Sequence, residues 1–199
     1  MIAVVILAAG ASTRMRGRDK LLEEIDGVPL LRRQVLRAVA TGAPVFVAVP
    51  PAPHARHDAI ADIDATLVPV SDAADGMNAS LSAGVSALPD GTKAAMIVLA
   101  DMPDLTTDDM KTILQAVDFK SDVLIWRSVT QAGAQGHPII FRSDLFDHLT
   151  ALRGDAGGRE VVRAHMARTQ AIALPDDHAR TDLDTPEAWA AWRAKRASI

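Results

Sequence analysis

Five short apolar runs without polar alternation constrain the fold of this chain more than any other feature. The runs are residues 3–8, 45–49, 65–70, 94–99 and 122–126. Such runs, rich in Val, Ile and Leu, are typical of strands that are covered on both faces. Segments with helical character lie between them, at residues 29–40, 53–61, 77–87 and 107–117. This alternation predicts an α/β fold, a Rossmann-like three-layer domain with a mostly parallel sheet.

The pattern is less regular after the fifth run. A polar stretch at 128–136 predicts a mobile loop, and residues 137–141 predict a strand with Pro138 at its edge. A last strand is expected at 170–174. Further helices are expected at 145–152, 159–166 and 186–195. Because 199 residues suit one full hydrophobic core and no linker is visible, we expect a single domain over residues 1–199.

Composition excludes several classes of protein. The net charge of −4 gives no overall positive field, so we expect no nucleic-acid partner. The chain has no cysteine, which excludes disulfides and thiolate metal sites. No apolar stretch reaches the length of a membrane span, and the amino terminus does not resemble a signal peptide. We therefore expect a cytoplasmic protein without a membrane partner.

The first apolar run leads directly into a loop of small and cationic residues. The run ends at Leu7-Ala8-Ala9-Gly10, and the loop then carries its cations, Arg14, Arg16, Arg18 and Lys20. Small residues let the backbone N–H groups approach phosphate oxygens, and the cations add positive charge, so the segment suits a polyphosphate. It is neither a P-loop nor a dinucleotide fingerprint, since both glycine patterns are absent. A second group of cations, Arg32, Arg33 and Arg37, is interpreted as a solvated face.

A single carboxylate, Asp101, follows the run at 94–99, and Pro103 stiffens the exit of the chain. Ligands of parallel sheets bind beyond the carboxyl ends of the strands, so the loops after residues 8 and 99 are expected to line one cleft. Asp101 is then placed to ligate Mg²⁺. The alternative is that it only caps the following turn. Because Asp101 is expected to face the cationic loop across one cleft, the role of metal ligand is favoured over that of a turn cap.

The segment Thr181-Asp182-Leu183-Asp184-Thr185-Pro186 supplies two more carboxylates. We expect their side chains to point to opposite sides of an extended segment, so that only one faces the cleft. Asp184 is favoured as the second metal ligand and Asp182 is its rival. The alternative role for Asp184 is to cap the last helix, where Thr185 is the expected cap and Pro186 the first helical residue.

These motifs together resemble a known family. Leu-Ala-Ala-Gly-x-Ser-x-Arg-Met, with Lys20 six residues after the arginine, is similar to the N-terminal loop of the MobA-like nucleotidyltransferases, and within them of the molybdenum cofactor cytidylyltransferases. Four later segments also resemble family motifs, at residues 76–81, 100–103, 136–138 and 154–159, besides the acidic segment above. Ala100 and Gly158 depart from the Gly and Ala that are common there.

The resemblance implies a role for each matching residue. It assigns nucleotide binding to Leu7, Ala8, Ala9, Gly10, Arg14, Lys20, Gly76, Ser80 and Asp101. It makes Asp101 and Asp184 the ligands of Mg²⁺. It makes His137 and Arg159 contacts of the acceptor. The catalytic residues that it implies are Arg14, Lys20 and Asp101. Simpler alternatives are that Ser80 packs a helix and that His137 bonds the backbone of a loop. His54 and His57 lie one helical turn apart, but no further ligand completes a zinc site, so a surface helix is favoured.

The implied activity is transfer of a nucleoside monophosphate to a phosphorylated acceptor with release of pyrophosphate. By resemblance, Ala9 favours CTP over GTP, because Ala-Ala-Gly accompanies cytosine transfer in the family. The segment between Arg14 and Lys20 is one residue longer than in some cytidylyltransferases. The acceptor implied by the family is molybdopterin, the molybdenum cofactor, and a molybdoenzyme or its chaperone is an implied partner. Two alternatives stay open: a sugar- or alcohol-phosphate nucleotidyltransferase of the same fold, and a non-catalytic nucleotide-binding protein that delivers a cofactor.

Overall fold

The sheet has seven strands in a mostly parallel arrangement. The computed structural model describes residues 1–71, 76–154 and 157–197. The sheet strands are β1 (Ile2–Leu7), β4 (Val45–Val49), β5 (Thr66–Pro69), β6 (Ala94–Leu99), β7 (Ile125–Val129), β8 (Gln135–Arg142) and β9 (Thr169–Ala173). Their order is β5-β4-β1-β6-β8-β7-β9. β8 is antiparallel to both of its neighbours, and the other pairings are parallel. The predicted α/β fold with a mostly parallel sheet is confirmed.

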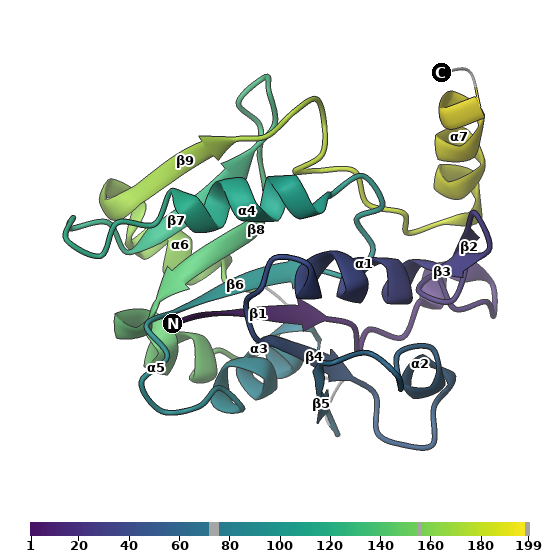
Figure 1. Ribbon diagram of the computed structural model, residues 1–199, viewed down its shortest axis with the longest axis horizontal. Helices are drawn as coiled ribbons and strands as arrows, with labels where there is room; N and C mark the ends of the chain where they lie inside the picture. The colour runs from purple at the N-terminus through teal and green to yellow at the C-terminus, as the bar shows by residue number, and fades with distance from the viewer. Residues whose placement is uncertain (72–75, 155–156, 198–199) are drawn as a thin grey trace.

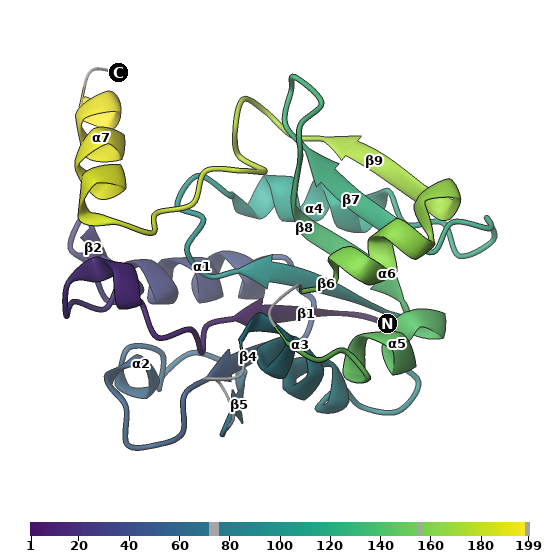
Figure 2. The same cartoon turned by 180° about the vertical axis from the view of Figure 1, so that it is seen from behind.

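Helices cover both faces of the sheet, which gives three layers (Figures 1 and 2). The α-helices are α1 (Leu30–Val39), α2 (Ala55–Asp58), α3 (Met77–Ser86), α4 (Thr107–Gln115), α5 (Phe146–Thr150), α6 (Arg159–Ala164) and α7 (Pro186–Ala197). Val4 and Ile6 of β1 belong to the core beneath α1 and α4. Ala3 and Val5 belong to the opposite core beneath α3, α5 and α6. Successive strand residues thus enter different cores, which is why the run is continuously apolar.

The strand after α4 is later in the chain than expected. The run at 122–126 predicts a strand there, but β7 is Ile125–Val129 and continues through Arg127 and a fully buried Ser128. The loop expected over 128–136 is shorter than predicted: it spans residues 130–134, because the two ends of that stretch belong to β7 and β8. Ser128 and Val129 are held in strand conformation by the pairing of β7 with β8 on one side and with β9 on the other.

The last helix packs beside a small hairpin that the sequence analysis did not foresee. The hairpin pairs β2 (Glu24–Ile25) with β3 (Val28–Pro29), and α7 stands next to it (Figure 1). The guanidinium of Arg196 pairs with the Asp26 carboxylate at 2.5 Å. The Thr185 hydroxyl accepts a hydrogen bond from the N–H of Ala188, as expected for a cap. This docking fixes the segment just before α7, which carries Asp182 and Asp184. In the described part of the chain, no helix is long and apolar enough to cross a bilayer.

Candidate active site

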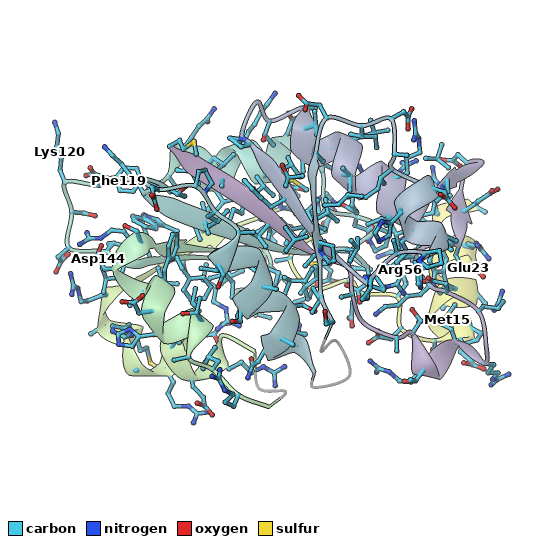
Figure 3. All side chains as sticks on the ribbon, turned by 90° about the horizontal axis from the view of Figure 1, so that it is seen from below. Met15, Glu23, Arg56, Phe119, Lys120 and Asp144 are labelled. Atoms are coloured by element: carbon cyan, nitrogen blue, oxygen red, sulfur yellow. The ribbon has the colours of Figure 1, made fainter. Side chains whose placement is uncertain are left out.

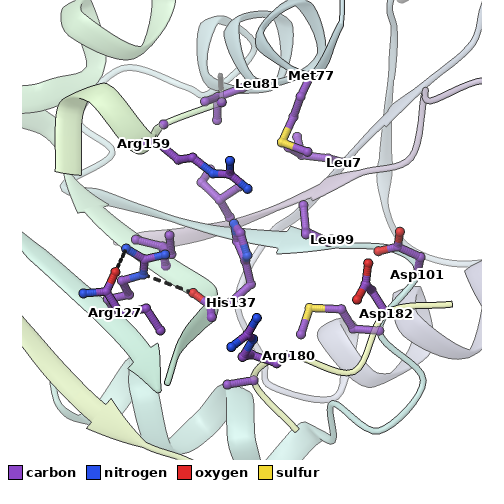
Figure 4. Close-up of a pocket in the computed structure, with 18 of the residues that line it drawn as sticks. Leu7, Met77, Leu81, Leu99, Asp101, Arg127, His137, Arg159, Arg180 and Asp182 are labelled. Carbon is purple, nitrogen blue, oxygen red and sulfur yellow. Dashed lines mark hydrogen bonds between the residues drawn. The ribbon is translucent and has the colours of Figure 1, made fainter. Parts of the chain in front are cut away.

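A cavity of about 570 Å³ opens at the carboxyl ends of β1 and β6. Its wall combines Leu7 of β1, Leu99 of β6, the start of β8, and the segment that precedes α7 (Figure 4). Because β8 runs antiparallel to β6, its first residues reach the same edge of the sheet as the end of β6. Arg14, Lys20 and Asp101 all line this cavity, so the two loops expected to share a cleft do share one.

Three carboxylates meet at one end of the cavity. One oxygen from each of Asp101, Asp182 and Asp184 lies within 4.8 Å of the others. We call these residues the acid cluster. The expectation that only one of Asp182 and Asp184 faces the cleft was wrong, because alternate residues of an extended segment lie on the same side. The N–H of Leu183 bonds to the carbonyl of Asp101 at 3.2 Å, which fixes the two acidic segments against each other.

The cations of the first loop pair directly with the acid cluster. The Lys20 ammonium donates to Asp101 Oδ2 at 2.5 Å and to Asp184 Oδ1 at 2.6 Å. Arg14 contacts Asp184 Oδ2 at 2.7 Å, although its side chain is 66% exposed. Burial acts to lower the pKa of Lys20, but the charges and hydrogen bonds of Asp101 and Asp184 outweigh burial and raise it. Lys20 is therefore held as a cation.

Asp182 and Asp184 differ in their affinity for a proton. Burial, followed by the hydrogen bond and charge of Asp184, raises the pKa of Asp182 above its ordinary value. The pKa of Asp184 is lowered: burial opposes this, but the hydrogen bond and charge of Lys20 prevail, with smaller help from Asp182 and Arg14. Asp101 Oδ1 is buried and has no hydrogen-bond partner among the described residues. Three carboxylates with one unsatisfied oxygen fit the hard oxygen ligands that a divalent cation prefers.

A buried arginine holds the first loop in shape. It lies on the helix that carries His54 and His57, which was expected at the surface. Arg56 of α2 is 2% exposed and lies on the same side of the molecule as Met15 and Glu23 (Figure 3). Its guanidinium forms a two-pronged pair with the Asp19 carboxylate at 2.7 and 2.8 Å, and donates to the Ala8 carbonyl at 2.6 Å. Arg56 thus ties the end of β1 to the residue before Lys20.

Replacing Arg56 with leucine is expected to lower the free energy of unfolding by about 3 kcal/mol, because the Asp19 carboxylate loses its buried partner. Urea unfolding followed by circular dichroism measures this loss. Arg32→Leu is the matched control, since the Arg32–Asp62 pair lies at the surface and contributes little. Equal midpoints for the two variants would show that the buried pair does not stabilise the loop.

Helix α1 supports the loop that carries Asp101. The side-chain amide of Gln34, which is fully buried, donates to the carbonyl of Met102. Arg37 Nη1 donates to the carbonyls of Pro103 and Leu105 at 2.8 and 2.7 Å. The interpretation of Arg37 as part of a solvated face was therefore wrong, and burial lowers its pKa. Gln34 and Arg37 position the carbonyls just after Asp101, so the loop is preformed.

His137 lies in the middle of the cavity wall. A Cβ on the preceding Gly136 would lie 1.9 Å from the carbonyl oxygen of Ala179, so this position requires glycine. The close approach lets the N–H of His137 bond that carbonyl at 2.8 Å. Burial, followed by the charge of Arg127, lowers the pKa of His137 to about 4. At neutral pH His137 is therefore an uncharged donor and acceptor.

The stability of the protein is expected to depend on this histidine below neutral pH. The folded pKa of about 4 lies under the ordinary 6.5, so the unfolded chain binds the proton first. Stability is then complete above about pH 6.5 and is lost as the pH falls toward 4. Between pH 7 and 4.5 the wild-type protein should lose about 2 kcal/mol more than His137→Gln, measured by urea unfolding. Identical losses in the two proteins would contradict the depressed pKa.

Some residues assigned by resemblance lie away from the cavity surface. Of the first loop, only Leu7, Arg14 and Lys20 are among the described residues that line it. The others assigned to the nucleotide are Ala8, Ala9, Gly10, Gly76 and Ser80. Ser80 is 5% exposed within α3, while Met77 and Leu81 of that helix do line the cavity. Within the motif at 154–159, Asp155 and Ala156 lie outside the described residues, and Arg159 reaches the cavity.

Two further arginines in the cavity wall were not foreseen. Arg127 comes from β7 and Arg180 from the segment after β9. Arg127 follows a strand-like run directly, which is a weak signal for a residue at a strand end. Arg180 stands next to the acidic segment at 181–186, and its nearness to that motif is the only sequence signal. His54 and His57 form no zinc site: His57 Nε2 bonds the Pro50 carbonyl at 2.7 Å.

This fold and cavity are those of a nucleotidyltransferase, and comparison with known proteins assigns the family. The model of the MobA-like NTP transferase domain matches residues 4–170. The chain belongs to the MobA-like NTP transferase family.

Individual relatives differ in how much of their length is shared. The purine catabolism protein PucB of Bacillus subtilis (strain 168) is 29% identical over 193 residues, which cover 92% of this chain and 91% of PucB. The bifunctional protein GlmU of Clavibacter sepedonicus is 36% identical over 124 residues, which cover 58% of this chain and only 24% of GlmU. Rv0371c of Mycobacterium tuberculosis H37Rv has a similar structure, with a TM-score of 0.82, 23% identity and 96% of each chain covered. Its structure has also been solved as a complex with manganese.

Proposed function

We propose that this protein transfers CMP from CTP to a phosphorylated acceptor, the molybdenum cofactor, in a magnesium-dependent reaction. The observation that carries the proposal is the contact of Lys20 and Arg14 with the acid cluster inside one cavity. Such a site combines groups that bind a triphosphate with groups that bind a divalent cation. The family membership supports the class of reaction, and the manganese complex of Rv0371c supports a divalent metal.

The metal would be held by Asp101 and Asp184, with Asp182 as a further ligand. When bound, Mg²⁺ would offset the negative charge of the triphosphate. Burial and, after it, the hydrogen bond and charge of Asp184 raise the pKa of Asp182, and a bound divalent cation would offset the charge of the neighbouring carboxylates. Lys20 and Arg14 would then move from the carboxylates to the β- and γ-phosphates. Ala8, Ala9, Gly10, Gly76 and Ser80 stay predicted contacts of the nucleotide.

The transfer needs little covalent chemistry from the protein. A phosphate oxygen of the acceptor attacks the α-phosphorus of CTP. The bond from the α-phosphorus to the oxygen that bridges the β-phosphorus breaks, and that oxygen leaves with pyrophosphate. The attacking oxygen is already an anion, so no strong general base is required. Lys20 and Arg14 stabilise the charge that develops on pyrophosphate, and positioning supplies the rest of the rate. His137 and Arg159 contact the acceptor.

The choice of CTP and of the acceptor rests on resemblance, with Ala9 as the residue that favours cytosine. Mass spectrometry tests both choices at once: the purified protein is incubated with Mg²⁺, equal amounts of CTP, GTP, ATP and UTP, and a molybdopterin extract. The expected product is the cytosine dinucleotide of molybdopterin, together with pyrophosphate. A guanine, adenine or uracil product would overturn the choice of base. Absence of any product, with intact nucleotides, would overturn the transfer to molybdopterin.

A second acceptor class, which the same fold also suits, is tested in a parallel assay. Sugar phosphates and alcohol phosphates can be offered in place of molybdopterin under the same conditions. Pyrophosphate released with one of these, and none with molybdopterin, would assign the protein to that class. Nucleotide binding without magnesium-dependent pyrophosphate release would instead favour a cofactor-delivery protein.

A further inference from the structure

The three carboxylates of the acid cluster come from two segments that are far apart in the sequence. Asp101 follows β6, whereas Asp182 and Asp184 belong to the acidic segment before α7, and Asp101 and Asp182 lie near each other in Figure 4. The separation of the two segments therefore sets the distances among the carboxylate oxygens. Lys20 bridges the segments, but in the proposed reaction it turns to the phosphates. Other contacts have to hold the segments together when a metal is bound.

His178 ties the chain just before the acidic segment to the start of α4. Its Nδ1 lies 2.8 Å from Asp109 Oδ2, and the Asp109 side chain is only 4% exposed. The same oxygen accepts hydrogen bonds from the N–H and the hydroxyl of Thr106, at 2.8 and 2.7 Å. These bonds fix the Asp109 carboxyl group on the first turn of α4, and His178 Nδ1 acts as a further donor to it. Because α4 follows the loop of Asp101, the His178 bond joins the two segments on one side of the acid cluster.

Trp192 ties the chain after the acidic segment to the same loop. Its indole Nε1–H donates to Asp104 Oδ1 at 2.8 Å, and an indole can only donate. Trp192 is held in place by the buried Trp189, whose ring meets it edge to face with 6.1 Å between the centroids. Since Asp104 lies in the loop after Asp101 and α7 follows the acidic segment, this bond joins the two segments on the other side of the acid cluster.

The pairs His178–Asp109 and Trp192–Asp104, which we call the clamp, therefore enclose the acid cluster in the chain. Neither pair uses a group of the acid cluster, so both remain when Lys20 leaves or a metal binds. The clamp restricts the separation of the ligands. Mg²⁺ is sensitive to such a restriction, since it requires near-ideal octahedral geometry at about 2.1 Å, whereas Ca²⁺ accepts more flexible geometries at about 2.3–2.6 Å.

We infer that His178 and Trp192 are positioning residues of the metal site, which hold the two segments at the separation that favours Mg²⁺ over Ca²⁺. The inference rests on the proposed function and deepens it by naming residues that set the preference for an ion. Neither side chain is among the described residues that line the cavity. Both act through the chain segments that carry the carboxylates, as groups behind the ligands of a metal commonly do.

The binding of ions to the full chain without nucleotide tests the inference. Electron paramagnetic resonance of the free ion gives the dissociation constant of Mn²⁺, and displacement of Mn²⁺ gives those of Mg²⁺ and Ca²⁺. The wild type should bind Mg²⁺ more tightly than Ca²⁺. His178→Leu and Trp192→Phe should each raise the dissociation constant of Mg²⁺ about tenfold, as expected for the loss of one hydrogen bond behind the ligands. The constant of Ca²⁺ should rise less, so the preference for Mg²⁺ falls about threefold or more.

Three variants serve as controls. His178→Asn should restore the wild-type preference, because its amide nitrogen can donate in place of Nδ1. Trp126→Phe also removes a buried indole N–H, but one without a hydrogen-bond partner among the described residues, and His148→Leu removes an exposed histidine of α5. Neither should change the ratio of the Mg²⁺ and Ca²⁺ constants. Partial unfolding would weaken the binding of both ions equally, so this ratio separates positioning from loss of fold.

Several results would overturn the inference. They are an unchanged ratio in His178→Leu and Trp192→Phe, a ratio that His178→Asn does not restore, and a wild type that prefers Ca²⁺ or binds no Mn²⁺ at millimolar concentration. Should His178→Leu fail to fold, Trp192→Phe carries the test, because it keeps an aromatic ring at that position. The assay for nucleotide products stays separate. Product from the wild type, with unchanged ratios in the variants, would refute the clamp alone, and shifted ratios without product would refute the transfer alone.

Discussion

Asp101→Asn is expected to lower kcat for nucleotidyl transfer by about a hundredfold or more. The substitution keeps the size of the side chain and removes the charge at the centre of the acid cluster. Losing one such electrostatic contact costs on the order of 3 kcal/mol of transition-state stabilisation. Pyrophosphate release with CTP, Mg²⁺ and molybdopterin measures the effect. The variant should also bind Mn²⁺ more weakly, which electron paramagnetic resonance of the free ion detects.

The control for this variant is Asp90→Asn, which removes an exposed carboxylate outside the cavity. It should retain wild-type turnover and Mn²⁺ affinity. Circular dichroism would establish that both variants are folded. If folded Asp101→Asn turned over at the wild-type rate, Asp101 would be only the cap of a turn, the alternative that its position after β6 leaves open.

Lys20→Met is expected to have effects of opposite sign on catalysis and on metal binding. Turnover should fall by about a hundredfold, because the leaving pyrophosphate loses a cation. In the absence of nucleotide, however, the affinity for Mn²⁺ should rise by about tenfold, equivalent to about 1.4 kcal/mol. The reason is that the Lys20 ammonium bridges Asp101 and Asp184, and thus competes with a metal for the same oxygens.

Lys120→Met is the control, since Lys120 is exposed on the far side of the molecule from Arg56 (Figure 3). It should change neither quantity. A Lys20→Met protein in which Mn²⁺ affinity fell together with turnover would contradict the competition. The variant would then report a general disturbance of the site instead of the removal of a rival cation.

The central strands and the two loops that follow them could be predicted, because burial on both faces leaves a continuous apolar run. The runs at 45–49 and 94–99 coincide with β4 and β6. The hairpin β2–β3 was missed although Asp26-Gly27, a favoured pair for a tight turn, lies at its tip with positive φ at both residues. Its strands have only two residues each, too few for a periodic signal.

Residues that act through distant partners could not be predicted from local pattern. Arg56 is buried because Asp19, 37 positions earlier, neutralises it. The local pattern around Arg37 is that of a surface cation, and only the folded structure brings the loop after Asp101 against it. The position of Asp182 beside Asp184 follows from the sequence, since residues two apart on an extended segment share a side. The arginines of the cavity wall come from elements that meet only in the folded sheet.

A crystal structure with Mn²⁺ and a non-hydrolysable CTP analogue tests the central claim most directly. Anomalous scattering locates the metal independently of any fitted ligand. The account predicts the metal in contact with the carboxylate of Asp101 and with Asp184 or Asp182, and Lys20 turned toward the β- and γ-phosphates. A nucleotide bound elsewhere, or a metal that leaves the Lys20–Asp101 pair intact, would contradict it.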